Sequence, residues 1–267
     1  NRIGKGMSYF MLGGEIARSL GPLYILGGIS LWGLEGTYRL LPLGLLASLL
    51  LYFKFKDIPI AGELKKKKKE SGALKAMKEQ LSLFVSIGGI FFFTALVKGS
   101  LTTFLPTYMT QNGSSLWVAG ISLSIVQFAG AAGTLFSGSI SDKIGRRFTL
   151  MVMAFTTPFL LLLFVFTSDS IFAIPILILI GFIMFATTPV LLAEVNTIKS
   201  EHSGLINGIF MTLNFAFSAV SMLLIGVLGD IFGLKTTYII AALASLVAIL
   251  FIIRLPKGES IYVASSK

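Results

Sequence analysis

The sequence predicts an all-α polytopic membrane protein, and three observations carry this prediction. Hydrophobic residues make up 55% of the 267 residues and charged residues only 13%, whereas a soluble domain carries about 25% charge. The mean hydropathy is +0.88. Eight apolar runs are long enough to cross a hydrocarbon core of about 30 Å at about 1.5 Å per residue. They cover residues 7–28, 37–53, 81–108, 116–137, 148–167, 171–193, 203–228 and 236–253.

The first run, 7–28, carries charge as well as apolar residues. Glu15 and Arg18 lie three positions apart and share one helix face, which predicts a local salt bridge. The alternative is that they line a substrate or proton pathway, because ionised groups inside a membrane are costly and usually functional. Gly21 and Pro22 follow, and the proline should kink the helix since it has no backbone N–H.

Residues 54–80, which follow the second run, form the one long polar stretch and include five consecutive lysines at 65–69. Suppose that the N-terminus, this stretch, the loop after residue 137, the junction 194–202 and the C-terminus lie on one side of the membrane. That side then holds 18 of the 22 basic residues. The positive-inside rule then makes that side cytoplasmic. We interpret the lysines as a solvated linker near anionic lipid, with nucleic-acid binding as the poorer alternative.

Polar residues in the later runs are candidates for substrate contact. Lys98, in the third run, has no acid within a helical turn, so it either serves the structure or faces a central cavity. Gln127 and Asn214 can bond across helices or to substrate, and Glu194 ends its run near the surface, where we expect an interfacial role. The sequence has no cysteine and a single histidine, His202, so we expect no metal site and no cofactor.

Residues 138–147 read G-x-x-x-D-K-x-G-R-R between two runs, which predicts a tight loop at the membrane surface. Its defined positions are Gly138, Asp142, Lys143, Gly145, Arg146 and Arg147. Asp142 can accept bonds from Arg146 or from the end of a neighbouring helix. The internal repeat described in the next paragraph places that helix end near residues 6–9. The alternative is a charged turn that only sets topology. Small residues at 130, 134 and 138, and at 133, 137 and 141, favour close helix packing.

A shift of 200 residues places the first two runs on the last two. Gly33-Leu34 and Thr37-Tyr38 then meet Gly233-Leu234 and Thr237-Tyr238 at the same outer junction. Such parallel repeats predict two pseudo-twofold halves. We therefore expect helices five to twelve of a twelve-helix protein, with a complete eight-span protein as the alternative. The expected parts are the last two helices of the N-terminal half (1–53), a cytoplasmic linker (54–80), the six-helix C-terminal half (81–254) and a cytoplasmic tail (255–267).

The pattern at 138–147 resembles the signature loop of the major facilitator superfamily (MFS) of transporters, and the resemblance covers the whole chain. Residues 4–15 with Gly21-Pro22, and residues 131–134, resemble the fosmidomycin-resistance subgroup of MFS exporters. Gly21-Pro22 is also similar, in part, to a motif of proton-coupled antiporters, although Ala17 replaces its first glycine. The resemblance implies an MFS-type helical bundle with substrate bound between its halves, and a loop at 138–147 that bridges the halves and acts as a conformational gate.

We therefore expect a secondary transporter that works by alternating access in the cytoplasmic (inner) membrane, a proton-coupled exporter of a drug or a phosphonate-like organic anion. Its partners would be the small-molecule substrate, protons, the lipid bilayer and the N-terminal helices of the same protein, within a monomer. An importer of a small organic anion or sugar is the alternative, and a non-transporting scaffold or sensor is a weaker one, because buried Lys98 and Arg18 argue against it. An enzyme is disfavoured, since the runs contain no H-E-x-x-H pair or aspartate dyad.

Overall fold

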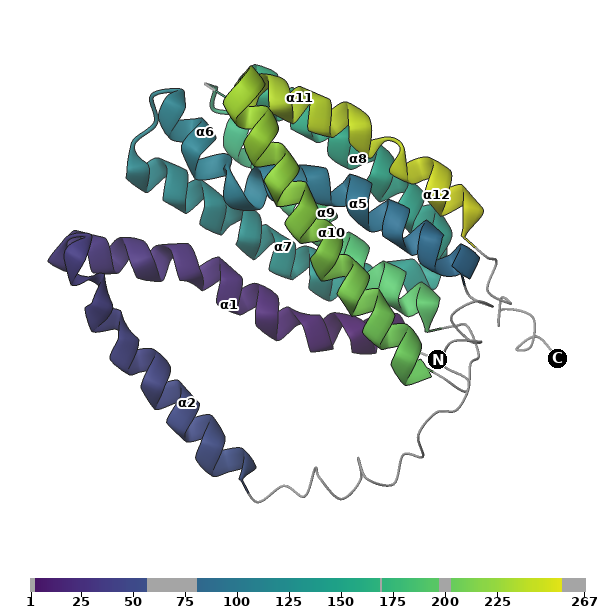
Figure 1. The fold of residues 1–267 in the computed structure, drawn as a ribbon, viewed down its shortest axis with the longest axis horizontal. Helices are drawn as coiled ribbons and strands as arrows, with labels where there is room; N and C mark the ends of the chain where they lie inside the picture. Colours follow the sequence, from purple (N-terminus) through teal and green to yellow (C-terminus); the bar gives the residue numbers. More distant parts are fainter. Residues whose placement is uncertain (1–2, 57–80, 169, 197–202, 256–267) are drawn as a thin grey trace.

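The computed structural model describes residues 3–56, 81–168, 170–196 and 203–255, with side chains described throughout these ranges except at 3–11, 55 and 203. This part of the chain consists of helices and turns without strands (Figure 1). The elements are α1 (Ile3–Trp32), the 3-10 helix η1 (Glu35–Leu40), α2 (Leu41–Phe55), α5 (Leu81–Thr103), α6 (Leu105–Gln111), α7 (Leu116–Ile144), α8 (Arg146–Thr167), α9 (Ala173–Val195), α10 (Ser203–Phe232), α11 (Leu234–Ser245) and α12 (Ala248–Arg254).

Seven stretches of the described helices are long and apolar enough to cross a membrane. Helix α1 covers the expected first run as one helix of 30 residues, but it is not among the seven, because Glu15 and Arg18 lower its hydropathy. Large apolar side chains point outward around the bundle, including Leu50 on α2, Phe155 on α8 and Leu223 on α10. This exposure suits contact with lipid and confirms the predicted all-α polytopic membrane fold.

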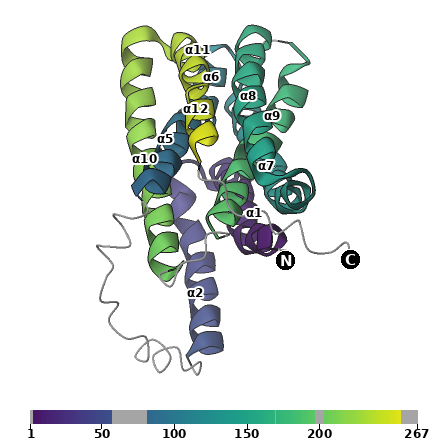
Figure 2. The ribbon, with the colours of Figure 1, turned by 90° about the vertical axis from the view of Figure 1, so that its right-hand side faces the viewer.

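The helices from α5 onward form one bundle. Helix α5 packs on α10, α11 and α12, and α8 packs on α9 and α11 (Figure 1). Helix α1 lies antiparallel beside α7 and also contacts α9. After η1 the chain turns away, and α2 projects from the bundle with contacts to η1 and an otherwise exposed surface (Figure 2). The long contact between α1 and α7 therefore joins the two expected halves.

Helices α7 and α9 approach closely because glycines face the partner helix. A Cβ atom on Gly133 would meet the backbone carbonyl of Phe182, and one on Gly181 would meet the carbonyl of Val126. Gly130 lies against the ring of Phe185. The small residues predicted to allow close packing thus do so on the side of α7 that faces α9.

Two expected runs are interrupted in the structure. The run 81–108 ends as a helix at Thr103, and α6 starts afresh with Pro106 in its first turn, where a proline needs no backbone donor. The run 236–253 divides into α11 and α12, where the N–H groups of Leu246 and Val247 donate to carbonyls three residues back. Such a tightened turn offsets the two parts of the helix without changing their hydropathy.

The proposed internal repeat has a glycine of similar φ at both of its outer junctions, although a 3-10 helix follows the first and an α-helix follows the second. Helices α1 and α10 each contain 30 residues, and each is followed by a glycine with positive φ, 72° at Gly33 and 78° at Gly233. Only glycine adopts such angles without strain. The repeat predicted from the sequence therefore places one glycine with positive φ on another.

Candidate functional site

The segment 138–147 is mostly helix and not the ten-residue loop that the sequence predicts. Helix α7 continues to Ile144, and α8 begins at Arg146. The chain reverses at Gly145 alone, whose φ of 95° is open to glycine but strained for other residues. The small and polar residues of the pattern extend the helix, so Gly138 and Asp142 lie in the last turns of α7.

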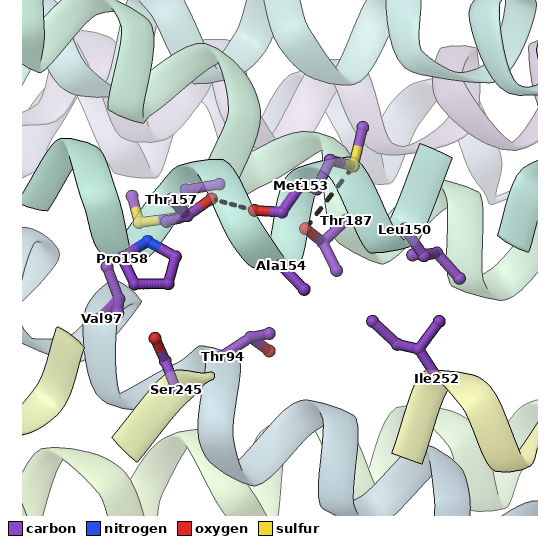
Figure 3. Close-up of a pocket in the computed structure, with 11 residues that line it drawn as sticks. Thr94, Val97, Leu150, Met153, Ala154, Thr157, Pro158, Thr187, Ser245 and Ile252 are labelled. Atoms are coloured by element: carbon purple, nitrogen blue, oxygen red, sulfur yellow. Dashed lines mark hydrogen bonds between the residues drawn. The ribbon is translucent and has the colours of Figure 1, made fainter. Parts of the chain in front are cut away.

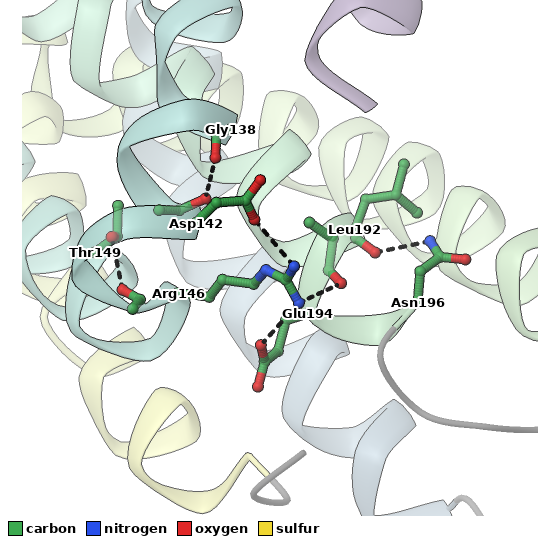
Figure 4. Close-up of polar contacts among 10 residues, drawn as sticks. Gly138, Asp142, Arg146, Thr149, Leu192, Glu194 and Asn196 are labelled. Atoms are coloured by element: carbon green, nitrogen blue, oxygen red, sulfur yellow. Dashed lines mark hydrogen bonds and ion pairs between the residues drawn. The ribbon is translucent and has the colours of Figure 1, made fainter. Parts of the chain in front are cut away.

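Arg146 is the centre of a polar network that joins α7, α8 and α9 (Figure 4). Its Nη2 donates to Asp142 Oδ1 at 3.1 Å, and its Nη1 donates to the carbonyl oxygen of Ala193 at 3.1 Å. The carboxylate of Glu194 lies 3.9 Å from the same Nη1. All three charged side chains are between 14% and 18% exposed, so water screens them little.

The network confirms the predicted bond between Asp142 and Arg146 and gives Glu194 a role that the sequence did not predict. Lys143 and Gly145 are exposed, while Arg147 is half-buried and its Nε has no hydrogen-bond partner among the described residues. The second expected partner of Asp142, near residues 6–9, falls outside the described side chains. Sequence reasoning placed Glu194 near the surface but missed its link to Arg146, because that link spans two helices.

The predicted salt bridge on α1 is present. Arg18 Nη1 donates to Glu15 Oε1 at 2.8 Å. The Glu15 side chain is only 7% exposed, whereas that of Arg18 is 50% exposed. Three residues after Arg18, Gly21 has no neighbouring atom within 4 Å of a Cβ atom placed on it, so it makes no close helix contact within the described chain. Pro22 lies within α1.

Lys98 is a half-buried cation in the second half of α5. Its Nζ lies 4.6 Å from the ring centroid of Phe185 on α9, a cation–π contact. In the described part of the chain, no carboxylate lies within the 4.0 Å of an ion pair with Lys98. Lys98 and Thr102 line a depression of about 40 Å³ between α5 and α10, together with Ser218. Asn214, also predicted for the site, lies one turn before Ser218 and is half-buried.

Phe185 is a residue that the sequence analysis missed, and it connects three helices. Pro189 has no N–H with which to bond the carbonyl of Phe185 in α9, and Thr134 Oγ1 of α7 donates to that carbonyl at 3.4 Å. The Phe185 ring lies against Gly130 and carries Lys98. The sequence signal for this contact is the proline four residues after the phenylalanine, because it leaves the phenylalanine carbonyl free to accept a bond from another helix.

Gln127 is buried on the side of α7 that faces α1. Its relative exposure is 7%, and its amide oxygen has no partner among the described residues. Gly120, seven residues earlier on the same helical face, packs against Leu26 of α1. The structure therefore places Gln127 at the α1–α7 interface with Glu15, while Lys98 and Asn214 lie on α5 and α10.

A separate cavity of about 20 Å³ lies inside the bundle between α5, α8, α9, α11 and α12 (Figure 3). Four hydroxyl groups line it, and each already has a partner: Thr94 donates to Ile90, Thr157 to Met153, Thr187 to the Met153 sulfur and Ser245 to Ala242. Each hydroxyl therefore already donates its proton within the protein, and the space suits at most a single water molecule. We therefore regard the cavity as a packing feature beside Pro158.

Long apolar helices with outward-facing apolar side chains define a polytopic membrane protein. The family model for the Major Facilitator Superfamily matches residues 1–216, and the chain belongs to this superfamily of transporters. It is 26% identical over 256 residues to the fosmidomycin resistance protein of Escherichia coli (strain K12). The alignment covers 94% of this chain and 62% of that protein, so the chain spans less than two thirds of its relative's length.

Proposed function

We propose that this protein is a proton-coupled exporter of small organic anions, phosphonates among them, and that it works by alternating access. In this proposal the acidic group of the substrate binds at Lys98, and the network around Arg146 acts as a cytoplasmic gate. The name of the fosmidomycin resistance relative supports export of a drug. The partial antiporter motif at Gly21-Pro22 supports proton coupling, and the distribution of basic residues supports a cytoplasmic linker and C-terminus.

The observation that carries the substrate class is the charge of the deep site. Glu15 is paired with Arg18, while Lys98 has no acid within 4.0 Å in the described chain. Glu15, Arg18 and Lys98 together carry one net positive charge. A cation in a site of low dielectric attracts anions and disfavours lipophilic cations. The aromatic ring of Phe185 holds Lys98 in place but does not neutralise it.

Replacing Lys98 with Gln tests this assignment. Removing one partner of a buried charge pair typically costs about 2–5 kcal/mol, which is at least about 25-fold in affinity. We expect cells that depend on the full-length protein to lose protection against fosmidomycin when it carries Lys98→Gln, and to retain part of it with Lys98→Arg. The readout is the minimal inhibitory concentration, with protein abundance in the membrane measured in parallel.

The exposed lysine Lys235 on α11 provides the matched control. Lys235→Gln removes the same charge from the outside of the bundle and should leave protection unchanged. Full protection by Lys98→Gln would refute anion recognition at Lys98.

A further inference from the structure

Three buried oxygen atoms at the interface of α1 and α7 have no hydrogen-bond partner within the described chain. They are Glu15 Oε2, Ser124 Oγ and Gln127 Oε1, and the three residues are 5%, 2% and 7% exposed. Only five side-chain atoms of the described residues are buried in this way without a partner, so most of them gather at one interface. Because an unsatisfied buried polar atom costs about 1–3 kcal/mol, such a cluster points to a missing partner.

Helical spacing brings the three residues to the same interface. On α7, Gly120, Ser124 and Gln127 follow one another at intervals of four and three residues and therefore share a face. On α1, Glu15 and Leu26 are both buried and share a face at an interval of 11 residues. Leu26 packs against Gly120, which shows that these two faces meet.

The unpartnered atoms lack a hydrogen-bond donor. Carboxylate and amide oxygens only accept, while a hydroxyl group can also donate. Arg18 donates to the other oxygen of Glu15, Oε1, and the Lys98 ammonium lies over the Phe185 ring. An anionic group would be repelled by Glu15, whereas an O–H or N–H group would satisfy the oxygens.

We propose that the α1–α7 interface is a second recognition subsite, in which Ser124 and Gln127 on α7, and Glu15 farther along the interface on α1, accept hydrogen bonds from O–H or N–H groups of the substrate. Lys98 lies over the Phe185 ring, which packs against Gly130, three residues after Gln127 on α7, so the two subsites lie in the same region of the protein. This inference rests on the proposed function, which places the acidic group of the substrate at Lys98. It narrows the cargo to small acids that also carry a hydrogen-bond donor.

The test compares matched pairs of probes on the purified full-length protein in nanodiscs. Each pair consists of an ω-hydroxyalkylphosphonate and the alkylphosphonate of the same chain length, from one to four carbons. We expect the hydroxyl compound of the best-fitting length to bind at least about fivefold more tightly than its alkyl partner. Isothermal titration calorimetry supplies both dissociation constants.

Two variants locate the preference. Gln127→Met and Ser124→Ala each remove one acceptor with little change of shape, and each should reduce the preference for the hydroxyl compound while the alkylphosphonate still binds. Retained alkylphosphonate binding also shows that the variants are folded. Ser137→Ala is the matched control, because its hydroxyl lies on the same helix and already donates to the Thr134 carbonyl at 3.1 Å.

The outcomes separate the two proposals. Equal affinity for both members of every pair in the wild type would overturn the subsite alone and indicate that water satisfies these oxygens. An unchanged preference in both Gln127→Met and Ser124→Ala would also overturn it. A wild type that binds no phosphonate would refute anion recognition at Lys98, and the subsite with it.

Discussion

Arg146 shows how one side chain can connect three helices. Its guanidinium group has several donors in a fixed plane, and here it bonds a carboxylate of α7 and a backbone carbonyl of α9 while Glu194 lies close by. The bond to Asp142 could be predicted, since the two residues are four positions apart in a recognised pattern. The bond to Ala193 and the ion pair with Glu194 could not, because they depend on how α8 packs against α9.

Asp142→Asn should weaken the gate without unfolding the protein. Asparagine keeps the shape of the side chain but loses the charge that holds Arg146. Couplings of this kind are typically about 1–3 kcal/mol, or about 5–150-fold in the equilibrium between two conformations. We expect the transport rate of the full-length protein to fall while its abundance in the membrane stays normal.

Lys54→Gln provides the control for this variant. Lys54 is exposed in the last turn of α2 and lies outside the charged segment, so its substitution should leave the transport rate nearly unchanged. If Asp142→Asn also transports at the wild-type rate, the segment only sets the topology.

Helix α9 connects the proposed gate around Arg146 to Lys98. At its C-terminal end, Ala193 and Glu194 contact Arg146. Further back in the same helix, the ring of Phe185 makes a cation–π contact with Lys98. The close approach of α7 and α9 could be predicted from the spacing of small residues in α7. The atoms of α9 that these residues contact could not be predicted, because nothing in the sequence indicates that Gly133 lies against the backbone of Phe182.

Gly133→Ala should destabilise the protein by separating α7 from α9. The added methyl group would meet the carbonyl of Phe182, which cannot move away as a flexible side chain would. Overpacking of this kind typically costs about 1–3 kcal/mol. We expect a lower midpoint of thermal unfolding for the purified full-length protein.

Gly27→Ala is the matched control on α1, because a Cβ atom placed there has no neighbour within 4 Å in the described chain. Alanine is favoured over glycine inside a helix by about 0.5–1 kcal/mol, so the midpoint should stay the same or rise. An unchanged midpoint for Gly133→Ala would contradict the close packing of α7 on α9.

For the whole molecule, the fold class could be predicted because lipid leaves few alternatives. A chain in the hydrocarbon core must satisfy its backbone internally, so long apolar runs become helices. The breaks at Phe104 and near Leu246 could not be predicted from hydropathy, since a short offset leaves the apolar run continuous. The candidate site was predicted only as separate residues, and the structure brought Glu15 and Gln127 to one interface and revealed Phe185 under Lys98.

The account's central claim is that the deep site recognises anions, and the binding preference of the purified full-length protein tests it most directly. Isothermal titration calorimetry would measure the dissociation constants of fosmidomycin and of the lipophilic cation tetraphenylphosphonium. The uncompensated charge of Lys98 predicts that fosmidomycin binds more tightly than tetraphenylphosphonium, and that Lys98→Gln removes this preference. Tighter binding of tetraphenylphosphonium by the wild type would contradict the claim.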